Sequence, residues 1–284
     1  MNIYQEIWDA DMNENGVRPI FASEKGDLSQ GFVAVNTESC HQDHRVIKEV
    51  SIPDRKRGSY EYVEKLFDNY TLNQTSREKN SISESKEVEE FLKMAVNSAP
   101  LRLAKKYLEE NTNKVLDEIQ WYTFLHRLWF RQFDWESGRD LSGFEHVFVG
   151  DQKGRKLVGH HFWYKYWLED TPTLNEHHNG LINMTCSAQD ELKYPSPDVI
   201  TVSYHLKAYD YEKRRFIKVI KRKCAFFVGL SAEGLLAIGT VRAMQESNTS
   251  EFLLNDVPYK LKLFMSPDGK RIRTFYPSYE PTQY

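Results

Sequence analysis

The chain has 284 residues, of which 40% are apolar and 13% aromatic, with a formal net charge of −3. This composition suffices for a packed core and excludes a disordered protein. No uninterrupted apolar run approaches the roughly 18 residues that a membrane-spanning helix needs, and the first 16 residues lack the cationic and then apolar pattern of a signal peptide.

The cysteines indicate the redox compartment. Cys40, Cys186 and Cys224 are odd in number and widely spaced. This spacing argues against a disulfide framework and is typical of proteins in a reducing environment. Because the sequence also lacks a signal peptide and a membrane span, we expect an intracellular, cytoplasmic protein with no membrane partner.

Charge is distributed unevenly along the chain. Residues 1–140 hold 19 Lys and Arg against 25 Asp and Glu, whereas residues 141–284 hold 19 against 16. A cluster of cations lies in the second part, at Lys213, Arg214, Arg215, Lys218, Lys221, Arg222 and Lys223. Such a cluster would concentrate positive potential near a docked phosphate. The alternative interpretation is a pair of strands with ordinary solvated charges.

The first 140 residues are predicted to be helical, because apolar residues recur there at spacings of three and four. The segments with this spacing are residues 3–12, 60–70, 85–97, 101–111 and 113–131. Pro100 would open its helix at a tolerated position. The polar residues between 73 and 83 predict an exposed loop.

After about residue 138 the pattern changes to alternation, which predicts short strands. They are expected at residues 144–150, 181–186, 199–209, 215–220, 225–228, 259–264 and 271–275. Helices are expected at residues 162–168 and 232–245, and a turn at Pro267-Asp268-Gly269. Strand hairpins with interspersed helices indicate an α+β fold. We therefore predict a helical region over residues 1–140 and a β-rich region over residues 141–284.

Two histidines are the most informative residues of the chain. His146 lies in Ser142-Gly-Phe-Glu-His-Val-Phe-Val-Gly-Asp151, and His161 lies in Val158-Gly-His-His-Phe-Trp163. Imidazole titrates near neutral pH, so two such rings can take a proton at one end of a reacting group and return it at the other. This is the chemistry of metal-free RNA cleavage. Taken singly, a strand histidine among aromatic residues is more often a packed side chain.

Together the two segments resemble those of the EndoU family, the uridylate-preferring endoribonucleases typified by the frog XendoU enzyme. The family places its first catalytic histidine in a Ser-Gly-Phe-Glu-His-Val-Phe-Val-Gly-Glu segment and its second in a Gly-x-His-x-Trp segment. The second pattern aligns with Gly159, His161 and Trp163, which leaves His160 as a neighbour. The resemblance implies a helical part followed by two small antiparallel-sheet lobes, with packed helices, that face each other across the active-site cleft.

The resemblance also implies a catalytic lysine. In the family it lies a few residues before a Phe-Phe-Ile-Gly segment, which corresponds here to Phe226-Phe-Val-Gly229. Counting back without a gap assigns Lys221. Lys218 and Lys223 remain alternatives, because a slip of one residue in strand register turns every side chain to the opposite face.

Further residues follow from the same resemblance. In the last motif, around residues 272–277, Thr274 would hydrogen-bond the uracil edge and Tyr276 would pack on the nucleoside. That motif alone would be an ordinary final strand.

Glu145 and Asp151 stand where the family has glutamates, so Asp151 has a shorter side chain than the usual residue. A carboxylate near an imidazole raises the pKa of the ring and fixes its tautomer.

Divalent ions are expected only from the family resemblance, which makes Mn²⁺ or Ca²⁺ plausible. The sequence itself offers Cys40, His41, Asp43 and His44 as possible ligands, or the pair His177-His178. Neither set has a recognisable tetrahedral spacing. Ordinary surface loops are the preferred interpretation of both.

The leading hypothesis is an endoribonuclease that cuts single-stranded, uridine-containing RNA by attack of the 2′-hydroxyl, leaving a 2′,3′-cyclic phosphate and a 5′-hydroxyl. Two alternatives belong to other classes. One is a catalytically silent RNA-binding module with the same fold. The other is a metal-dependent hydrolase built from residues 40–44 and 177–178.

Overall fold

Helices of the first half form where apolar residues recur at spacings of three and four. The computed structural model describes residues 2–36, 45–170, 196–210, 212–245 and 251–279, and the backbone of residues 182–184. Its helices up to residue 140 are α1 (Ile3–Asn13), α2 (Asp54–Glu64), α3 (Ile82–Ala95), α4 (Ala99–Thr112) and α5 (Glu118–Leu125), the last continued by the π-helix η1 (His126–Phe130).

Two of these helices begin earlier than predicted, and a capping box explains one of the two starts. The Ser81 side chain accepts a hydrogen bond from the Glu84 backbone, and the Glu84 side chain accepts one from the Ser81 backbone. This capping box starts α3 inside the predicted loop of residues 73–83. Likewise α2 begins at Asp54, directly after Pro53, and not at residue 60 as predicted. A capping box therefore sets the start of α3, whereas α2 begins after Pro53 without a side-chain cap.

Short strands within the first half were missed. They are β1 (Arg18–Phe21), β2 (Phe32–Val35) and β3 (Ile47–Ser51), which form one sheet, and the hairpin strands β4 (Phe133–Trp135) and β5 (Gly138–Leu141). β2 is the central strand of its sheet and is buried along its whole length. A continuously buried strand does not alternate, so the period-two pattern is absent from its sequence.

The second half contains two larger sheets. One has the order β6-β7-β10-β9-β8, in which only β7 and β10 pair in parallel, and the other has the order β11-β12-β13 and is antiparallel. Their strands are β6 (Asp151–Lys153), β7 (Lys156–Val158), β8 (Ile182–Met184), β9 (Val199–Asp210), β10 (Arg215–Phe227), β11 (Glu251–Leu254), β12 (Val257–Met265) and β13 (Ile272–Ser278). The α+β prediction is confirmed.

Helices accompany these sheets in the second half. They are α6 (Trp163–Asp170), α7 (Ala232–Met244) and the π-helix η2 (Glu145–Val149). A strand was predicted over residues 144–150, and this prediction is wrong. Phe144, Val147 and Phe148 are all buried, and their spacing of three and four is that of a helix. The Phe144 and Phe148 rings stack with centroids 4.4 Å apart.

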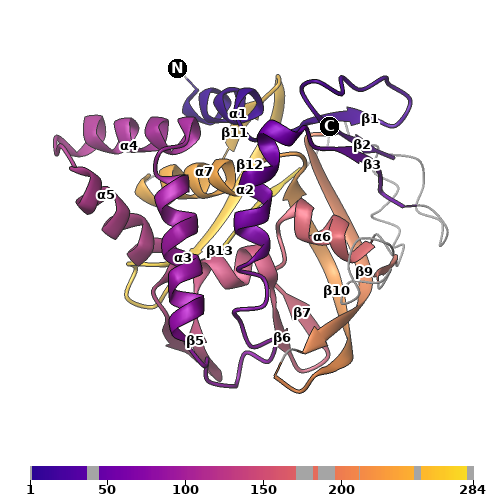
Figure 1. The fold of residues 1–284 in the computed structure, drawn as a ribbon, viewed down its shortest axis with the longest axis vertical. Helices are drawn as coiled ribbons and strands as arrows, with labels where there is room; N and C mark the ends of the chain where they lie inside the picture. The colour runs from indigo at the N-terminus through magenta and orange to yellow at the C-terminus, as the bar shows by residue number, and fades with distance from the viewer. Residues whose placement is uncertain are drawn as a thin grey trace.

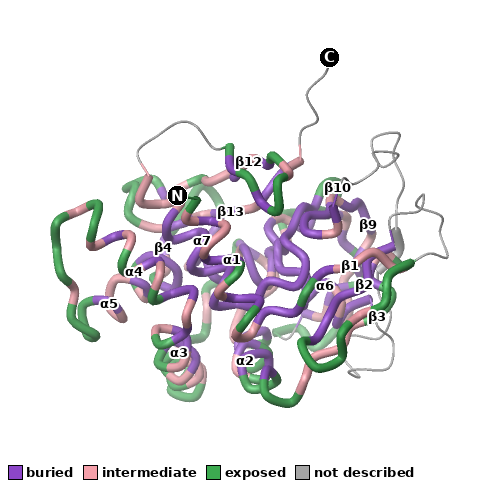
Figure 2. Tube along the Cα trace, turned by 90° about the horizontal axis from the view of Figure 1, so that it is seen from above, coloured by how far each residue is buried: buried purple, intermediate pink, exposed green. Residues whose placement is uncertain are grey.

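One hydrophobic core runs through both halves of the chain. Figure 2 shows α7 among the buried segments in the middle of the molecule, and α1 and α4 pack on it. The buried Asp11 carboxylate of α1 accepts a hydrogen bond of 2.8 Å from the backbone of Ser231, the N-cap of α7. In Figure 1 the N-terminal helix α1 lies beside the C-terminal strand β11. The division at residue 140 remains a prediction about organisation.

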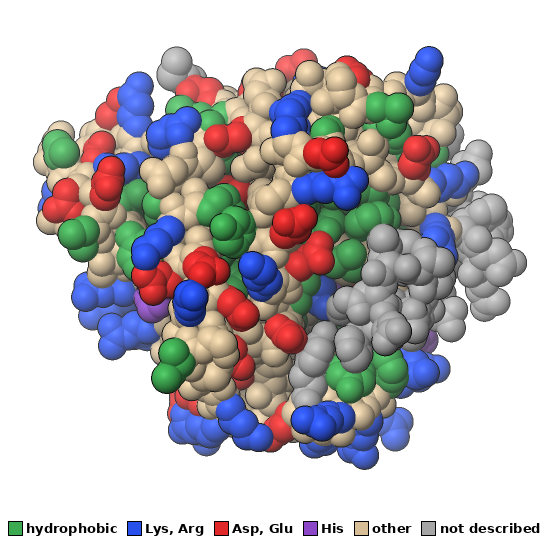
Figure 3. Space-filling view, in the orientation of Figure 1, with side chains coloured by type: hydrophobic (Ala, Val, Ile, Leu, Met, Phe, Trp, Pro, Cys, Tyr) green, Lys and Arg blue, Asp and Glu red, His purple; other side chains and the backbone are tan. Residues whose placement is uncertain are grey.

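Surface helices carry charges of both signs. On the face drawn in Figure 3, Lys and Arg side chains are interspersed with Asp and Glu. Pairs four residues apart, such as Lys86 with Glu90 at 3.6 Å, account for part of this mixture. None of the helices in the described part of the chain combines the length and apolarity that crossing a bilayer requires.

Candidate active site

His146 lies on the π-helix η2, a helix type that often marks functional positions. The start of η2 is pressed against β13, since a Cβ added at Gly143 would lie 2.5 Å from the Ile272 carbonyl oxygen. The Phe144 and Phe148 rings anchor the other side of η2 in the core. His146 itself remains partly accessible, with 18% of its side chain exposed. The histidine is thus a partly exposed residue of a closely packed helical turn.

The second histidine lies between β7 and α6, next to the first. Gly159 and His160 both have left-handed backbones, with φ of +69° and +62°. This turn lets the His160 N–H donate to the His146 carbonyl at 2.8 Å and the His161 N–H donate to the Val147 carbonyl at 2.6 Å. The structure therefore brings the two predicted histidine segments together.

Hydrogen bonding defines the tautomer of His161. Its Nδ1 lies 2.9 Å from the Ala225 carbonyl oxygen, which can only accept, so Nδ1 carries the proton and Nε2 keeps a lone pair. Burial lowers the pKa of His161 well below its ordinary value, and the positive charge of Lys221 lowers it further. His161 is therefore a neutral imidazole with an unprotonated nitrogen at neutral pH.

Lys221 is the buried cation of β10. The register of β10 against β9 shifts between Lys221 and Cys224. Lys221 is 5% exposed, and its Nζ donates to the Gly159 carbonyl, whereas Lys218 and Lys223 face solvent. Burial lowers the pKa of Lys221, and the nearby Cys224 and Asp151 oppose that shift. Of the three lysines considered, Lys221 is the one at the histidine turn.

A pair of buried acids supports His146. Its Nδ1 lies 2.5 Å from an Asp151 carboxylate oxygen, and Asp151 is 1% exposed. Burial raises the pKa of Glu145 well above its ordinary value, and the charge of Asp151 raises it further. The raised pKa favours the protonated form of Glu145.

One acid of this cluster was missed in the sequence. Glu78 accepts hydrogen bonds from the Thr71 backbone at 2.9 and 3.0 Å. Burial raises its pKa to about 7, and the charge of Asp151 contributes to that shift. Glu78 stands in the stretch predicted as an exposed loop, and no motif surrounds it. Only the tertiary fold places it near Glu145 and Asp151.

A polar cluster beneath the histidine turn was also missed. His160 Nε2 lies 2.7 Å from Glu169, its Nδ1 contacts the Tyr204 hydroxyl, and its carbonyl accepts from Cys224 at 2.8 Å. Burial lowers the pKa of His160, but Glu169 and Cys224 together more than offset that effect and leave the pKa raised. Glu169 is held in turn by Lys165 at 3.1 Å. These groups fix the residue next to His161.

Thr274 and Tyr276 lie on one face of β13, because side chains two residues apart on a strand point the same way. The Tyr276 ring stacks on the His161 ring, with centroids 4.5 Å apart and an interplanar angle of 15°. The Thr274 hydroxyl is buried and has no hydrogen-bond partner among the described residues. Tyr276 is therefore in contact with His161, and Thr274, two residues away on the same strand face, offers a free polar atom.

Comparison with known proteins identifies the family. The sequence profile described as endoribonuclease XendoU matches residues 1–277. The chain belongs to this family. Uridylate-specific endoribonuclease C of Danio rerio is 27% identical over 289 residues, covering 97% of this chain and 86% of the relative. Poly(U)-specific endoribonuclease-A of Xenopus laevis is 23% identical over 284 residues, covering 97% and 91%.

A solved structure agrees on the fold of this XendoU family member. The structure titled "The structure of XendoU: a splicing independent snoRNA processing endoribonuclease" superimposes with a TM-score of 0.69 at 19% sequence identity. The match covers 99% of this chain and 97% of that chain. The resemblance inferred from the histidine segments is confirmed.

Metal ligation finds no support in the described residues of this family member. They contain no group of three or more His, Cys, Asp and Glu side chains placed to hold one ion. The candidates Cys40, His41, Asp43 and His44, and the pair His177-His178, lie outside the described residues. We therefore derive no chemical step through Mn²⁺ or Ca²⁺.

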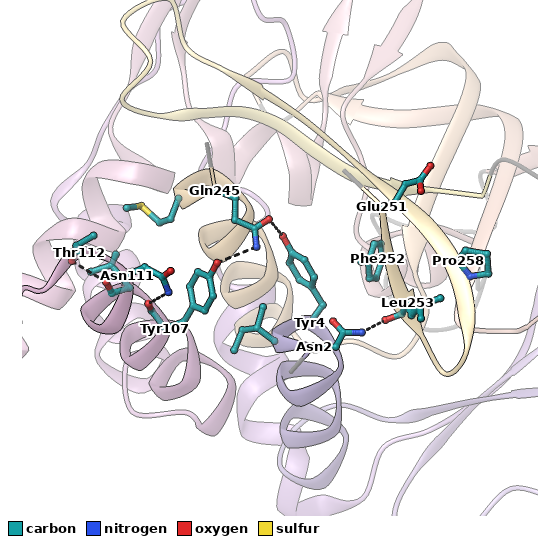
Figure 4. A pocket seen from close by; sticks show the side chains of 13 residues that line it. Asn2, Tyr4, Tyr107, Asn111, Thr112, Gln245, Glu251, Phe252, Leu253 and Pro258 are labelled. Carbon is teal, nitrogen blue, oxygen red and sulfur yellow. Dashed lines mark hydrogen bonds between the residues drawn. The ribbon is translucent and has the colours of Figure 1, made fainter. Parts of the chain in front are cut away.

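A large hollow among the described residues lies away from this site. It has a volume of about 1040 Å³ and lies between α1, α4, α7 and the strands β11 and β12 (Figure 4). Its polar side chains satisfy one another, since Tyr4 donates to Gln245 at 2.7 Å and Gln245 donates to Tyr107 at 3.3 Å. None of the predicted catalytic residues lines it. Cavity size therefore does not locate the chemistry here.

The partnership of Asp151 with His146 can be tested by substitution. We expect Asp151→Asn to lower kcat for RNA cleavage by about 10- to 100-fold, which corresponds to the roughly 1.5–3 kcal/mol of a hydrogen bond to a charged group. Asp151→Glu restores the carboxylate that the family has there and should retain most of the activity. Equal losses in the two variants would mean that the carboxylate charge is not what matters.

Proposed function

We propose that this protein is an endoribonuclease that cleaves single-stranded RNA at uridylates by transesterification. The observation that carries the proposal is that the Nδ1 atoms of the two imidazoles have different hydrogen-bond partners. His161 has an unprotonated Nε2 because its Nδ1–H donates to Ala225. His146 instead has a carboxylate oxygen of Asp151 at 2.5 Å from its Nδ1. Membership of the endoribonuclease XendoU family supports the same activity.

His161 acts as the general base in this proposal. Its Nε2 takes the proton of the ribose 2′-hydroxyl, and the freed oxygen attacks the adjacent phosphorus. A base must be unprotonated to begin, and the lowered pKa of the buried His161 ensures that at neutral pH. The Tyr276 ring, stacked on the imidazole, holds it in place.

His146 acts as the general acid. Its Nε2–H gives a proton to the 5′-oxygen as the bond from phosphorus to that oxygen breaks. The products are then a 2′,3′-cyclic phosphate and a 5′-hydroxyl, and the two histidines have exchanged protonation states. Asp151 stabilises the imidazolium before the step and, by holding Nδ1–H, keeps Nε2 directed at the leaving oxygen.

Lys221 supplies the fixed positive charge of this proposal. Negative charge builds up on the nonbridging phosphate oxygens as the pentacovalent phosphorane forms, and a preorganised cation in a dry site stabilises it strongly. The Gly159 carbonyl holds the Lys221 ammonium at the same turn that carries His161.

Preference for uridine is assigned to Thr274. Its buried hydroxyl lacks a partner in the described structure and can both donate to and accept from the edge of a base. The names of the Danio rerio and Xenopus laevis relatives, which print uridylate and poly(U) specificity, support this assignment. Single-stranded RNA is the expected partner, since an edge-on contact requires an unpaired base.

Cleavage of a defined oligonucleotide tests the proposal. A single-stranded RNA with one uridine should be cut only after that uridine, with a cyclic phosphate on the 5′ fragment and a free hydroxyl on the 3′ fragment. The assay is repeated with EDTA, manganese and calcium, because a requirement for an ion in the chemical step would appear as loss of cleavage with EDTA. Linear phosphate ends would point to metal-activated water and contradict the proposal. Salt-sensitive binding without any cut product would instead favour a silent RNA-binding module.

The lysine assignment makes a separate prediction. We expect Lys221→Ala to lower kcat by about 100- to 1000-fold, because one preorganised charge-stabilising group is removed. Lys218→Ala is the matched control, since Lys218 is on the same strand but exposed. It should weaken only the salt-dependent part of RNA binding. A larger catalytic loss in the control than in Lys221→Ala would reassign the lysine.

A further inference from the structure

An exposed cluster of aromatic and cationic side chains continues the face of β13 that carries Thr274 and Tyr276. The register of β12 against β13 pairs Phe264 with Thr274 and then Met265 with Ile272. Arg273 is therefore an extra residue, left unpaired in a β-bulge. Bulges re-aim side chains and are frequent beside active sites.

Phe264 and Thr274 lie on the same face of the sheet, because residues directly opposite on antiparallel strands do so. The Arg273 side chain reaches that face, since its guanidinium lies over the Phe264 ring. The guanidinium carbon lies 5.5 Å from the centre of the Phe264 ring and 5.5 Å from that of the Trp135 ring. Trp135 comes from β4, far away in the sequence. An arginine thus lies between two aromatic rings at the end of the predicted base pocket.

These rings are accessible, unlike most aromatic residues of the chain. Trp135 is 36% exposed and Phe264 45% exposed. The carboxylate of Glu136 pairs with Lys153 at 2.9 Å, and the nearby charge of Arg273 contributes to lowering the pKa of Glu136. An exposed indole and an exposed phenyl ring that both contact one guanidinium are poorly explained as core packing. The same combination binds single-stranded nucleic acids, through stacking of bases on the rings and attraction of the backbone to the cation.

We propose that Trp135, Phe264 and Arg273 form a subsite for a nucleotide that flanks the scissile uridylate, with its base stacked on an exposed ring and its phosphate paired with Arg273. The proposal rests on the proposed endoribonuclease function. The route along the surface is continuous: His161 stacks on Tyr276, Thr274 follows on the same strand face, and the bulge at Arg273 comes next. The strand β13, which carries Arg273, also packs against η2, the helix that carries His146.

The subsite is tested with two substrates. One is a heptanucleotide with a single ribouridine at its centre and deoxynucleotides elsewhere. The other is a uridine 3′-(4-nitrophenyl) phosphate, which has no flanking nucleotide. For the heptanucleotide, Trp135→Ala should raise KM by about tenfold, as expected for loss of one stacked base, with kcat at saturation unchanged. For the nitrophenyl ester, kcat and KM should stay within twofold of the wild type.

Further variants sharpen the result. Phe264→Ala and Arg273→Ala should also raise KM for the heptanucleotide, whereas Trp135→Phe should keep most of the affinity because it keeps a ring. Leu253→Ala is the control, since Leu253 is another exposed apolar residue of the same sheet but is not part of the cluster. Abasic substitution at each flanking position should locate the stacked base: one position should raise KM in the wild type and no longer do so in Trp135→Ala.

The subsite and the catalytic proposal fail in different ways. An unchanged heptanucleotide KM in all three variants would overturn the subsite while cleavage persists. A wild type that cuts neither substrate would overturn the catalytic proposal alone. In that case equilibrium binding of the all-deoxy heptanucleotide still tests the subsite. Trp135→Ala should weaken this binding about tenfold, and equal binding by the variant and the wild type would overturn the subsite.

Discussion

Replacing His161 by alanine should lower kcat for RNA cleavage by about 100- to 10,000-fold, the usual contribution of one general acid or base. His146→Ala should cause a loss of similar size. RNA binding should persist in both variants, which fluorescence anisotropy with an uncleavable all-deoxy strand measures. His126→Ala is the control, because His126 lies on η1 and contacts Tyr122 and Phe130, none of them at the candidate site.

Burial of His161 requires a check on folding. The side chain is 5% exposed and donates to Ala225, so His161→Gln, which keeps a polar group of similar reach, accompanies the alanine variant. Circular dichroism should report folded protein for at least the Gln variant. Full activity in a folded His161 variant would remove this residue from the mechanism.

The pH profile provides a readout that a purely structural role would not move. The base must be neutral, so kcat/KM rises with pH through the pKa of His161. Burial and then Lys221 lower that pKa well below its ordinary value near 6.5, so the acidic limb should lie well below pH 6.5. Removing the positive charge in Lys221→Ala should move this limb to higher pH. A limb that does not move would contradict the coupling between the two residues.

Substituting Gly159 should damage both stability and activity. A Cβ added there would lie 1.8 Å from the His146 carbonyl oxygen, at a backbone φ of +69°. Gly159→Ala therefore combines a backbone clash with left-handed strain, and we expect a loss of about 3–5 kcal/mol in the free energy of unfolding. Activity should fall with it, because the hydrogen bond of 2.8 Å from His160 to His146 must break.

Gly154→Ala is the matched control for this prediction. Gly154 also has a positive φ, of +65°, but nothing lies within 4 Å of the added Cβ. It should lose only about 1 kcal/mol through left-handed strain, with cleavage unaffected. Urea unfolding of the two variants measures the difference. Similar losses in both would mean that the close approach of Gly159 to His146 does not hold the turn.

The largest error in the secondary-structure prediction concerns the segment around His146. Its alternation of polar and apolar residues favoured a strand, whereas Phe144, Val147 and Phe148 lie on the buried side of a π-helix. Short segments of this kind satisfy both periods, and the packing of Phe148 against the core decides between them. The missed strand β2 has the opposite cause, since a strand buried on both faces carries no alternation.

By itself the sequence determined the family, the α+β class and the histidines, because side-chain chemistry and motif order are properties of the chain. Only the tertiary structure decided the hydrogen-bond partners and the burial of these groups. The tautomer of His161 depends on a carbonyl 64 residues away, and the choice of Lys221 depends on which β10 lysine is buried at Gly159. Burial and hydrogen-bond partners set protonation states, and both arise from segments that meet only on folding.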